Sequence, residues 1–185
     1  MGEIDDAIER ADHEAFTKAP PKTLKGQIGY LLKVLGSAKA VASEIGVTAD
    51  SVNRYRRGAR KHPRADVAAR IDDAVRQRWQ PRVRKRRRRK AATTGGITVE
   101  TRARFGYTAP VGTTDDGRFR RLTVHLPPSY AQRLFDASEG GASDQQMRGI
   151  IAEGFKEVYF QDGGGRAMGL SEVEINAIDY LDLDY

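Results

Sequence analysis

Apolar positions in the first half of the chain recur every three or four residues, which is the spacing of one face of an α-helix. The pattern predicts four helical segments, at residues 4–16, 24–35, 40–58 and 64–79. Gly46 divides the third segment into two short helices, and Pro81 follows the fourth, where the missing N–H of proline ends a helix. We therefore expect an all-helical N-terminal domain over residues 1–81.

From residue 97 the apolar residues alternate with polar ones, a period of two that is typical of a strand with one buried face. The pattern predicts a β-hairpin from residues 97–107 and 119–126, helices over 129–138 and 143–158, and a final strand or tail over 174–185. Ser143 and Gln146 have the spacing of a capping box. The expected fold class is α+β, with the helical domain, a basic arm and linker over residues 82–96, and a small α+β domain over 97–185.

The charge is divided unevenly along the 185 residues, which hold 32 Lys+Arg and 25 Asp+Glu for a net charge of +7. Residues 1–90 carry +12, whereas residues 91–185 carry −5. A basic half joined to an acidic half predicts that one half binds nucleic acid and that the other has a different task.

Several function classes are excluded by what the sequence lacks. Zero cysteine removes disulfide frameworks, thiolate zinc sites and cysteine nucleophiles. No apolar run approaches the ~20 residues that span a bilayer, and the acidic start of the chain is unlike a signal peptide. Because a phosphate-binding Gly-Lys-Ser/Thr loop and a nucleophile elbow are also absent, we do not expect an ordinary metabolic enzyme, and we assign no catalytic residue, bound cofactor or metal. Together with the charge, these absences lead us to expect a cytoplasmic protein that faces nucleic acid and has no membrane partner.

Residues 41–55 have the spacing of a helix-turn-helix, with a small Ala42 where two helices cross, Gly46 in the turn and Thr48 as a cap. Asn and Arg on the second helix can make bidentate contacts with adenine and guanine edges in the major groove. The alternative is an ordinary helical hairpin with a solvated polar face, but the neighbouring cations favour DNA. The expected DNA-contacting residues are Ser51, Asn53, Arg54, Arg57, Arg60 and Lys61.

A block of eight cations in nine positions follows Pro81. It consists of Arg82, Arg84, Lys85, Arg86, Arg87, Arg88, Arg89 and Lys90. Such a block repels itself, which argues against packing into a core. It can be a solvated tail, a localisation patch or an arm that tracks phosphates, and its place after the helix-turn-helix favours the arm. Five phosphate contacts would weaken DNA binding by about 10²–10³-fold between about 50 and 200 mM salt.

Two patterns in the acidic half have competing interpretations. Residues 121–127 and the two helices after them are laid out as in ribbon-helix-helix proteins, in which Arg121, Thr123 and His125 would face a groove and two chains would pair. The net negative charge favours a shared scaffold only, and a homodimer is left open. Asp182 and Asp184 would share one face of a strand, as in a metal-binding nucleotidyl transferase, or belong to an acidic tail, which is the simpler interpretation.

The stretch TVETRARFG at residues 98–106 runs into a segment that contains Thr113-Thr114-Asp115-Asp116. These residues closely resemble the telomere-protecting terminal proteins of linear actinomycete chromosomes and plasmids. The resemblance extends over nearly the whole chain, including WQPRV at residues 79–83, LFDA at 134–137, EVYFQDGG at 157–164 and IDYLD at 178–182.

The resemblance implies a protein primer that becomes covalently linked to the 5′ end of linear DNA and protects that end. It places the attachment on the hydroxyl of Thr114, with Thr113 as the neighbouring alternative, and implies a substrate of a DNA polymerase rather than an enzyme. The implied partners are that polymerase with its Mg²⁺ and dNTP, a telomere-associated recruiting protein, and DNA at the 3′ overhang and the end duplex.

The residues themselves suit this role, because a primer hydroxyl must enter a polymerase active site on a thin loop. Gly112 and Gly117 bracket such a loop. Asp115 and Asp116 either support the reaction, by steering Mg²⁺ or accepting the threonine proton, or simply form a turn. The acidic domain would then dock in the basic polymerase channel as a mimic of duplex DNA. The rival functions are a helix-turn-helix transcriptional repressor and a self-nucleotidylating enzyme that uses the carboxylates near the C-terminus.

Overall fold

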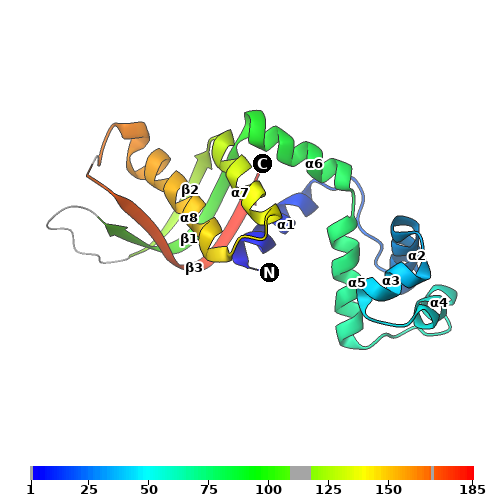
Figure 1. Ribbon diagram of the computed structural model, residues 1–185. Helices are drawn as coiled ribbons and strands as arrows, with labels where there is room; N and C mark the ends of the chain where they lie inside the picture. Colours follow the sequence, from blue (N-terminus) through cyan, green and yellow to red (C-terminus); the bar gives the residue numbers. More distant parts are fainter. Residues whose placement is uncertain (1, 109–117, 168) are drawn as a thin grey trace. The chain divides into compact units, whose positions relative to one another are not determined.

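A computed structural model describes residues 2–108, 118–167 and 169–185 (Figure 1). The chain divides into two units, one made of residues 16–81 and the other of residues 1–15 together with 82–185. The described residues form eight α-helices and one three-stranded antiparallel sheet, which confirms the predicted α+β class.

The helical unit contains α2 (Leu24–Leu35), α3 (Ala38–Ile45), α4 (Ala49–Arg57) and α5 (Ala65–Arg78), close to the predicted segments. Their apolar faces meet in one core, which includes the fully buried Ile28, Leu31, Val41, Ile45, Val52 and Ile71. The side chains of Thr23, Ser37 and Thr48 cap the first turns of α2, α3 and α4 by accepting backbone N–H groups. The unit therefore has its own core and its own capped helices.

The sheet of the other unit has the strand order β2-β1-β3, from β1 (Ile97–Thr108), β2 (Arg118–Leu126) and β3 (Glu172–Asp184). The helices α1 (Glu3–Glu14), α7 (Pro128–Glu139) and α8 (Asp144–Gly154) pack on one face of this sheet (Figure 1). Ile97, Val99, Ala103 and Phe105 of β1 point into that core, as the alternation predicted. Arg102, Arg104 and Arg121 point to the opposite face of the sheet and are exposed.

Two short helical segments follow α8: a π-helical turn, η2 (Phe155–Phe160), and a 3₁₀ turn, η3 (Asp162–Gly164). The capping box predicted at the start of α8 is present, because Ser143 and Gln146 bond each other's backbone N–H groups. These helices and turns close the core of the α+β unit over the sheet.

The N-terminal helix belongs to a different unit from the one that we predicted. We expected α1 within a helical domain over residues 1–81, but its apolar residues Ile4 and Ile8 are buried in the core of the α+β unit. Polar contacts hold it there, since Ser138 donates to Asp5 at 2.7 Å and Arg10 donates to the main-chain oxygen of Leu181 at 2.6 Å. The amphipathic stripe predicted the helix but not which core it would cover.

The predicted arm and linker over residues 82–96 is also ordered and packed. It forms α6 (Pro81–Lys90), followed by a π-helical turn, η1 (Ala91–Gly95), in which Ala91 is buried. The physical reason is that carboxylates from α1, α7 and β3 neutralise one side of the basic helix, as the next subsection shows. The self-repulsion that argued against packing is thereby offset.

The strand of the predicted ribbon is paired within the chain. β2 lies antiparallel to β1 from Phe105↔Arg118 to Ile97↔Leu126. One edge of β2 is therefore occupied by β1, and β1 in turn pairs with β3 on its other side.

Candidate nucleic-acid interface

The turn between α3 and α4 is fixed by a glycine and by a threonine cap. Gly46 adopts φ +64° and ψ +43°, a left-handed conformation that costs glycine little. The hydroxyl oxygen of Thr48 accepts the N–H of Ser51 at 3.2 Å, and Val52 and Tyr55 are buried beneath α4. These contacts orient the polar side of α4 away from the core of the helical unit.

The residues predicted to contact DNA on α4 are not equally exposed. Arg54 and Arg57 are exposed, whereas Ser51 and Asn53 are half-buried. The Ser51 hydroxyl lies 3.0 Å from that of Thr48, so it belongs to the cap of the helix. Arg54 forms an exposed ion pair with Asp50 at 2.8 Å, a type of pair that contributes little and exchanges readily for another anion. The predicted DNA-contacting residues of α4 that remain accessible are therefore the exposed Arg54 and Arg57 and, in part, Asn53.

Arg60 and Lys61 follow α4 directly and are both exposed. The guanidinium of Arg60 lies 5.8 Å from the centre of the Tyr55 ring, within the range of a cation–π contact. Because Tyr55 belongs to α4 and is buried in the core of the helical unit, this contact keeps Arg60 close to α4.

The basic helix α6 has two different faces. Arg82, Lys85, Arg86, Arg89 and Lys90 are exposed, whereas Val83, Arg84, Arg87 and Arg88 are half-buried. This alternation follows the helical repeat, in which residues three and four positions apart share a face. The eight cations that looked equivalent in the sequence therefore have two different surroundings.

The inner face of α6 is held by Asp12 of α1, whose side chain is fully buried. Arg88 donates to one carboxylate oxygen of Asp12 from two nitrogens, at 2.7 and 3.2 Å, and Arg84 lies 3.9 Å from the same oxygen. The hydroxyl of Tyr185 donates to the other oxygen at 2.7 Å. A buried carboxylate needs such partners, because an unpaired charge in a protein interior is strongly destabilising.

The Asp12 cluster shifts the ionisation of its members. Burial opposes the charge of Arg88, but the hydrogen bond and the charge of Asp12 outweigh it and raise the pKa of Arg88 above its ordinary value. Burial also raises the pKa of the Tyr185 phenol, and the neighbouring Asp12 adds to that shift. Arg88 is further held by Glu139 at 3.3 Å and lies over the ring of Phe135.

Arg87 completes the inner contacts of α6. It forms an ion pair with Asp184 of β3 at 3.1 Å and donates a hydrogen bond to the main-chain oxygen of Tyr185. Arg84, Arg87 and Arg88 were predicted to bind DNA, but in the structure they tie α6 to α1, α7 and β3.

The segment predicted to carry the covalent attachment lies outside the described residues, which stop at Thr108 and resume at Arg118. This applies to Thr113, Thr114, Asp115 and Asp116. The structure describes the strands on either side of it, β1 and β2, which are neighbours in the sheet. Tyr107 near the end of β1 is half-buried, packs edge-on against the ring of Phe160, and has a pKa raised by burial.

The two carboxylates of the proposed nucleotidyl-transfer site lie on one face of β3, as predicted, with Leu181 and Leu183 buried on the other. Each carboxylate has an arginine partner: Asp182 pairs with Arg10 at 3.1 Å, and Asp184 pairs with Arg87. Within the described ranges, no three acidic or histidine side chains are grouped closely enough to hold a metal ion.

Arg121, Thr123 and His125 lie on the exposed side of β2, opposite the buried Leu122 and Val124. Glu100 accepts hydrogen bonds from Arg121 at 2.6 Å and from the Tyr180 hydroxyl at 3.0 Å, and these bonds lower the pKa of its carboxyl. His125 bonds Thr98 at 3.0 Å. These contacts join strands within the sheet.

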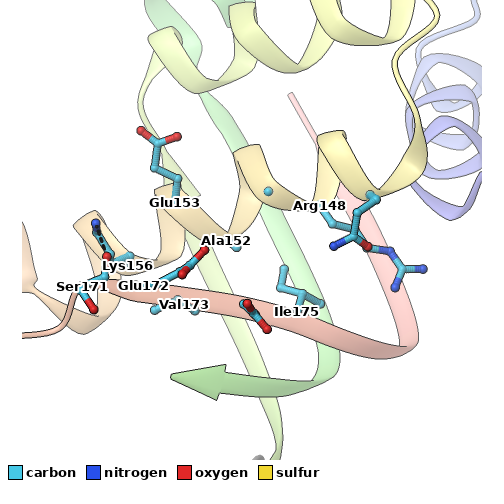
Figure 2. A pocket seen from close by; sticks show the side chains of 11 residues that line it. Arg148, Ala152, Glu153, Lys156, Ser171, Glu172, Val173 and Ile175 are labelled. Carbon is cyan, nitrogen blue, oxygen red and sulfur yellow. Dashed lines mark hydrogen bonds between the residues drawn. The ribbon is translucent and has the colours of Figure 1, made fainter. Parts of the chain in front are cut away.

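A cavity of about 410 Å³ lies between α8 and the first half of β3 (Figure 2). Figure 2 shows the Lys156 ammonium, which donates to the main-chain oxygen of Ser171 at 3.1 Å. Arg148 is paired with Glu3 and Asp144 at 2.6 and 2.7 Å. Because both cations already have partners, the cavity has no cation left to attract an anionic ligand.

Sequence reasoning missed Asp12, the residue that orders the basic helix. A signal for it was present, since residues 1–15 hold six acidic residues and one arginine, an excess next to the most basic stretch of the chain. When the charges are counted over the two observed units, the helical unit is strongly basic, with 14 Lys+Arg and 5 Asp+Glu. The α+β unit is nearly neutral, with 18 Lys+Arg and 20 Asp+Glu.

Comparison of the chain with protein-family models, with characterised proteins and with solved structures gives no match. In the part of the chain that the structure describes, no helix has the length and apolar character needed to cross a membrane.

Proposed function

We propose that this chain is a terminal protein of linear DNA: a protein primer whose Thr114 hydroxyl accepts the first deoxynucleotide from a DNA polymerase. The chain then stays attached to the 5′ end and protects it. The observation that carries the proposal is the division of the molecule into a basic helical unit and an α+β unit in which the Thr114 segment links two paired strands.

The helical unit would hold the DNA, with α3 and α4 acting as a helix-turn-helix. Three features support this: the left-handed Gly46 in a short turn, the Thr48 cap, and the exposed Arg54 and Arg57 beside the half-buried Asn53 on α4. Asparagine and arginine match the hydrogen-bonding edges of adenine and guanine in the major groove. The unit's excess of nine positive charges would add a sequence-independent attraction to phosphates.

The α+β unit would present the threonine to the polymerase. A covalent primer replaces a DNA 3′ hydroxyl, so the reaction transfers a nucleotidyl group from a dNTP to the threonine oxygen, with loss of its proton and release of pyrophosphate. The polymerase and its Mg²⁺ supply the catalysis. A recruiting protein bound to the telomere, the 3′ overhang and the end duplex are the further partners, and the protein would act in the cytoplasm at the ends of the nucleoid DNA.

Docking of the α+β unit by duplex mimicry is part of this proposal. The negative charge available for this mimicry is smaller than the −5 of residues 91–185, because the basic helix α6 belongs to the same unit. In addition, Glu100 already accepts a hydrogen bond from Arg121. Asp115 and Asp116 remain the acidic residues next to the attachment position. Reversing their charge should weaken binding to the polymerase, and docking that is insensitive to both salt and this change would contradict the mimicry.

The experiment that separates the three candidate functions uses labelled dNTP and Mg²⁺, with and without the polymerase. A primer is labelled only when polymerase is present, and the label is lost in Thr114→Ala. Label without polymerase indicates a self-nucleotidylating enzyme, for which Asp182→Asn is the matched test. No label under any condition leaves the helix-turn-helix repressor as the remaining function. Thr113→Ala is the control for a general disturbance of the segment.

A further inference from the structure

Four cations on the outer face of α6 have no hydrogen-bond or ion-pair partner among the residues that the structure describes. They are Arg82, Lys85, Arg86 and Arg89, at the i, i+3, i+4 and i+7 positions of one helix face. All four are exposed and together line one surface hollow of about 220 Å³. None of them forms an ion pair with any residue that the structure describes, in contrast to the cations on the inner face.

The outer face is held in place by the inner one. Arg88 and Arg84 are fixed to the buried Asp12, and Arg87 is fixed to Asp184. A helix anchored on two neighbouring elements loses little further freedom when its outer side chains bind a ligand, so less of the binding free energy is spent on ordering it. The outer cations are thus presented on a rigid support instead of on a flexible arm.

The ligand that fits this face is the phosphate backbone of duplex DNA. Arg82 and Arg89 are seven residues apart, which is about 10 Å along a helix axis. Duplex DNA carries one negative charge per about 1.7 Å, so about six phosphates lie within that length. Arginine and lysine suit phosphate oxygens, and the outer face includes no apolar residue that would insert into a lipid surface.

We propose that the outer face of α6 is a sequence-independent binding site for duplex phosphates on the α+β unit, whereas Arg84, Arg87 and Arg88 position the helix. The inference rests on the proposed DNA-binding function and deepens it, because it gives the α+β unit a binding site for duplex DNA that is separate from the one on the helical unit. This second binding site would bring duplex DNA to the same unit of the chain that carries Thr114.

The test compares two variants of the full chain that remove the same charge from the same unit. The first replaces the outer four residues by glutamine. The matched control replaces four exposed cations elsewhere on the unit, Arg102, Arg121, Arg133 and Arg166, also by glutamine. The dissociation constant for a duplex of arbitrary sequence is measured between about 50 and 200 mM NaCl, and circular dichroism confirms that each variant is folded.

The expected result follows from counterion release. Removing four phosphate contacts lowers the slope of log K against log[salt] by about 3.6, so the wild type loses about 10²-fold more affinity over this salt range than the outer variant does. The control should change the slope by less than about one. A double variant, Arg82→Gln with Arg86→Gln, should lower it by about two.

An unchanged slope in the outer variant, or an equal change in the control, overturns the inference, because the effect would then be absent or due to net charge alone. Labelling by the polymerase distinguishes this failure from failure of the proposed function. A chain that primes through Thr114 but shows no change of slope refutes only the α6 site. A chain that shows the change of slope but is never labelled refutes only the primer.

Discussion

The buried carboxylate of Asp12 gives the sharpest prediction about stability. Replacing Asp12 with asparagine keeps the size of the side chain but removes the charge that faces Arg88 and Arg84. Breaking a buried ion pair by removing one partner costs about 3–5 kcal/mol. The lower end applies here, because the side chains of Arg88 and Arg84 keep 20% and 15% of their surface exposed and can regain some hydration.

We therefore expect Asp12→Asn to lower the free energy of unfolding of the α+β unit by about 3 kcal/mol. In a unit of this size, each kcal/mol shifts the melting temperature by about 3–5 °C, so Tm should fall by about 10 °C. Differential scanning calorimetry of the full chain is the assay, since two units with separate cores can melt in separate transitions. Only the transition of the α+β unit should move.

Asp6→Asn is the matched control, since Asp6 lies on the same helix and carries the same charge but is exposed. It should change stability by no more than about 0.5 kcal/mol. A fall in Tm for Asp12→Asn that is no larger than that for Asp6→Asn would refute the role assigned to the buried cluster. It would equally refute the claim that α6 is held as a rigid support.

Three further predictions concern single positions. Gly96→Ala should destabilise the α+β unit by more than about 2 kcal/mol in urea unfolding, because Gly96 has φ +69° and the added Cβ would overlap a carbonyl oxygen of β2. Gly149→Ala is the control: Gly149 lies on an open helix face, so this change should stabilise the unit by about 0.5–1 kcal/mol. The unfolded chain ionises Tyr185 near the ordinary tyrosine pKa of 10.0, and the folded chain does so only at higher pH. The contribution of Tyr185 to the stability of the α+β unit should therefore be fully present below about pH 10 and be lost as the pH rises further. Unfolding at successive pH values above neutrality should show this fall in stability, with a smaller fall in Tyr185→Phe. Asn53→Ala and Arg57→Ala should each weaken binding to a duplex selected from a random pool by about 1–3 kcal/mol and binding to an unrelated duplex far less, so equal losses on both duplexes would contradict base recognition by α4.

The secondary structure of this chain follows from local sequence, and the structure confirms most of it. The 3.6-residue period located α2 to α5, the period of two located β1 and β2, and Ser143 with Gln146 marked the start of α8. Each of these signals acts between residues that are a few positions apart, so the sequence carries it directly.

The two errors of prediction have a common physical origin. The apolar stripe that includes Ile4 and Ile8 could pack against either core. It packs against the sheet because of contacts with residues more than 130 positions away, such as that between Asp5 and Ser138. The basic run could not be divided into two faces, because Asp12 lies 76 positions from Arg88. Residue spacing does not identify partners this far apart; the acidic excess of residues 1–15 indicates that such partners exist but not which carboxylate is buried.

Covalent attachment at Thr114 is the central claim, and mass spectrometry of the reaction product tests it most directly. The full chain is incubated with the polymerase, Mg²⁺ and one dNTP, digested, and the modified peptide is fragmented. The account predicts one nucleotide on Thr114, still present in Thr113→Ala and absent in Thr114→Ala. A nucleotide on Thr113 or on Tyr107, or a chain that remains unmodified with an active polymerase, would contradict it.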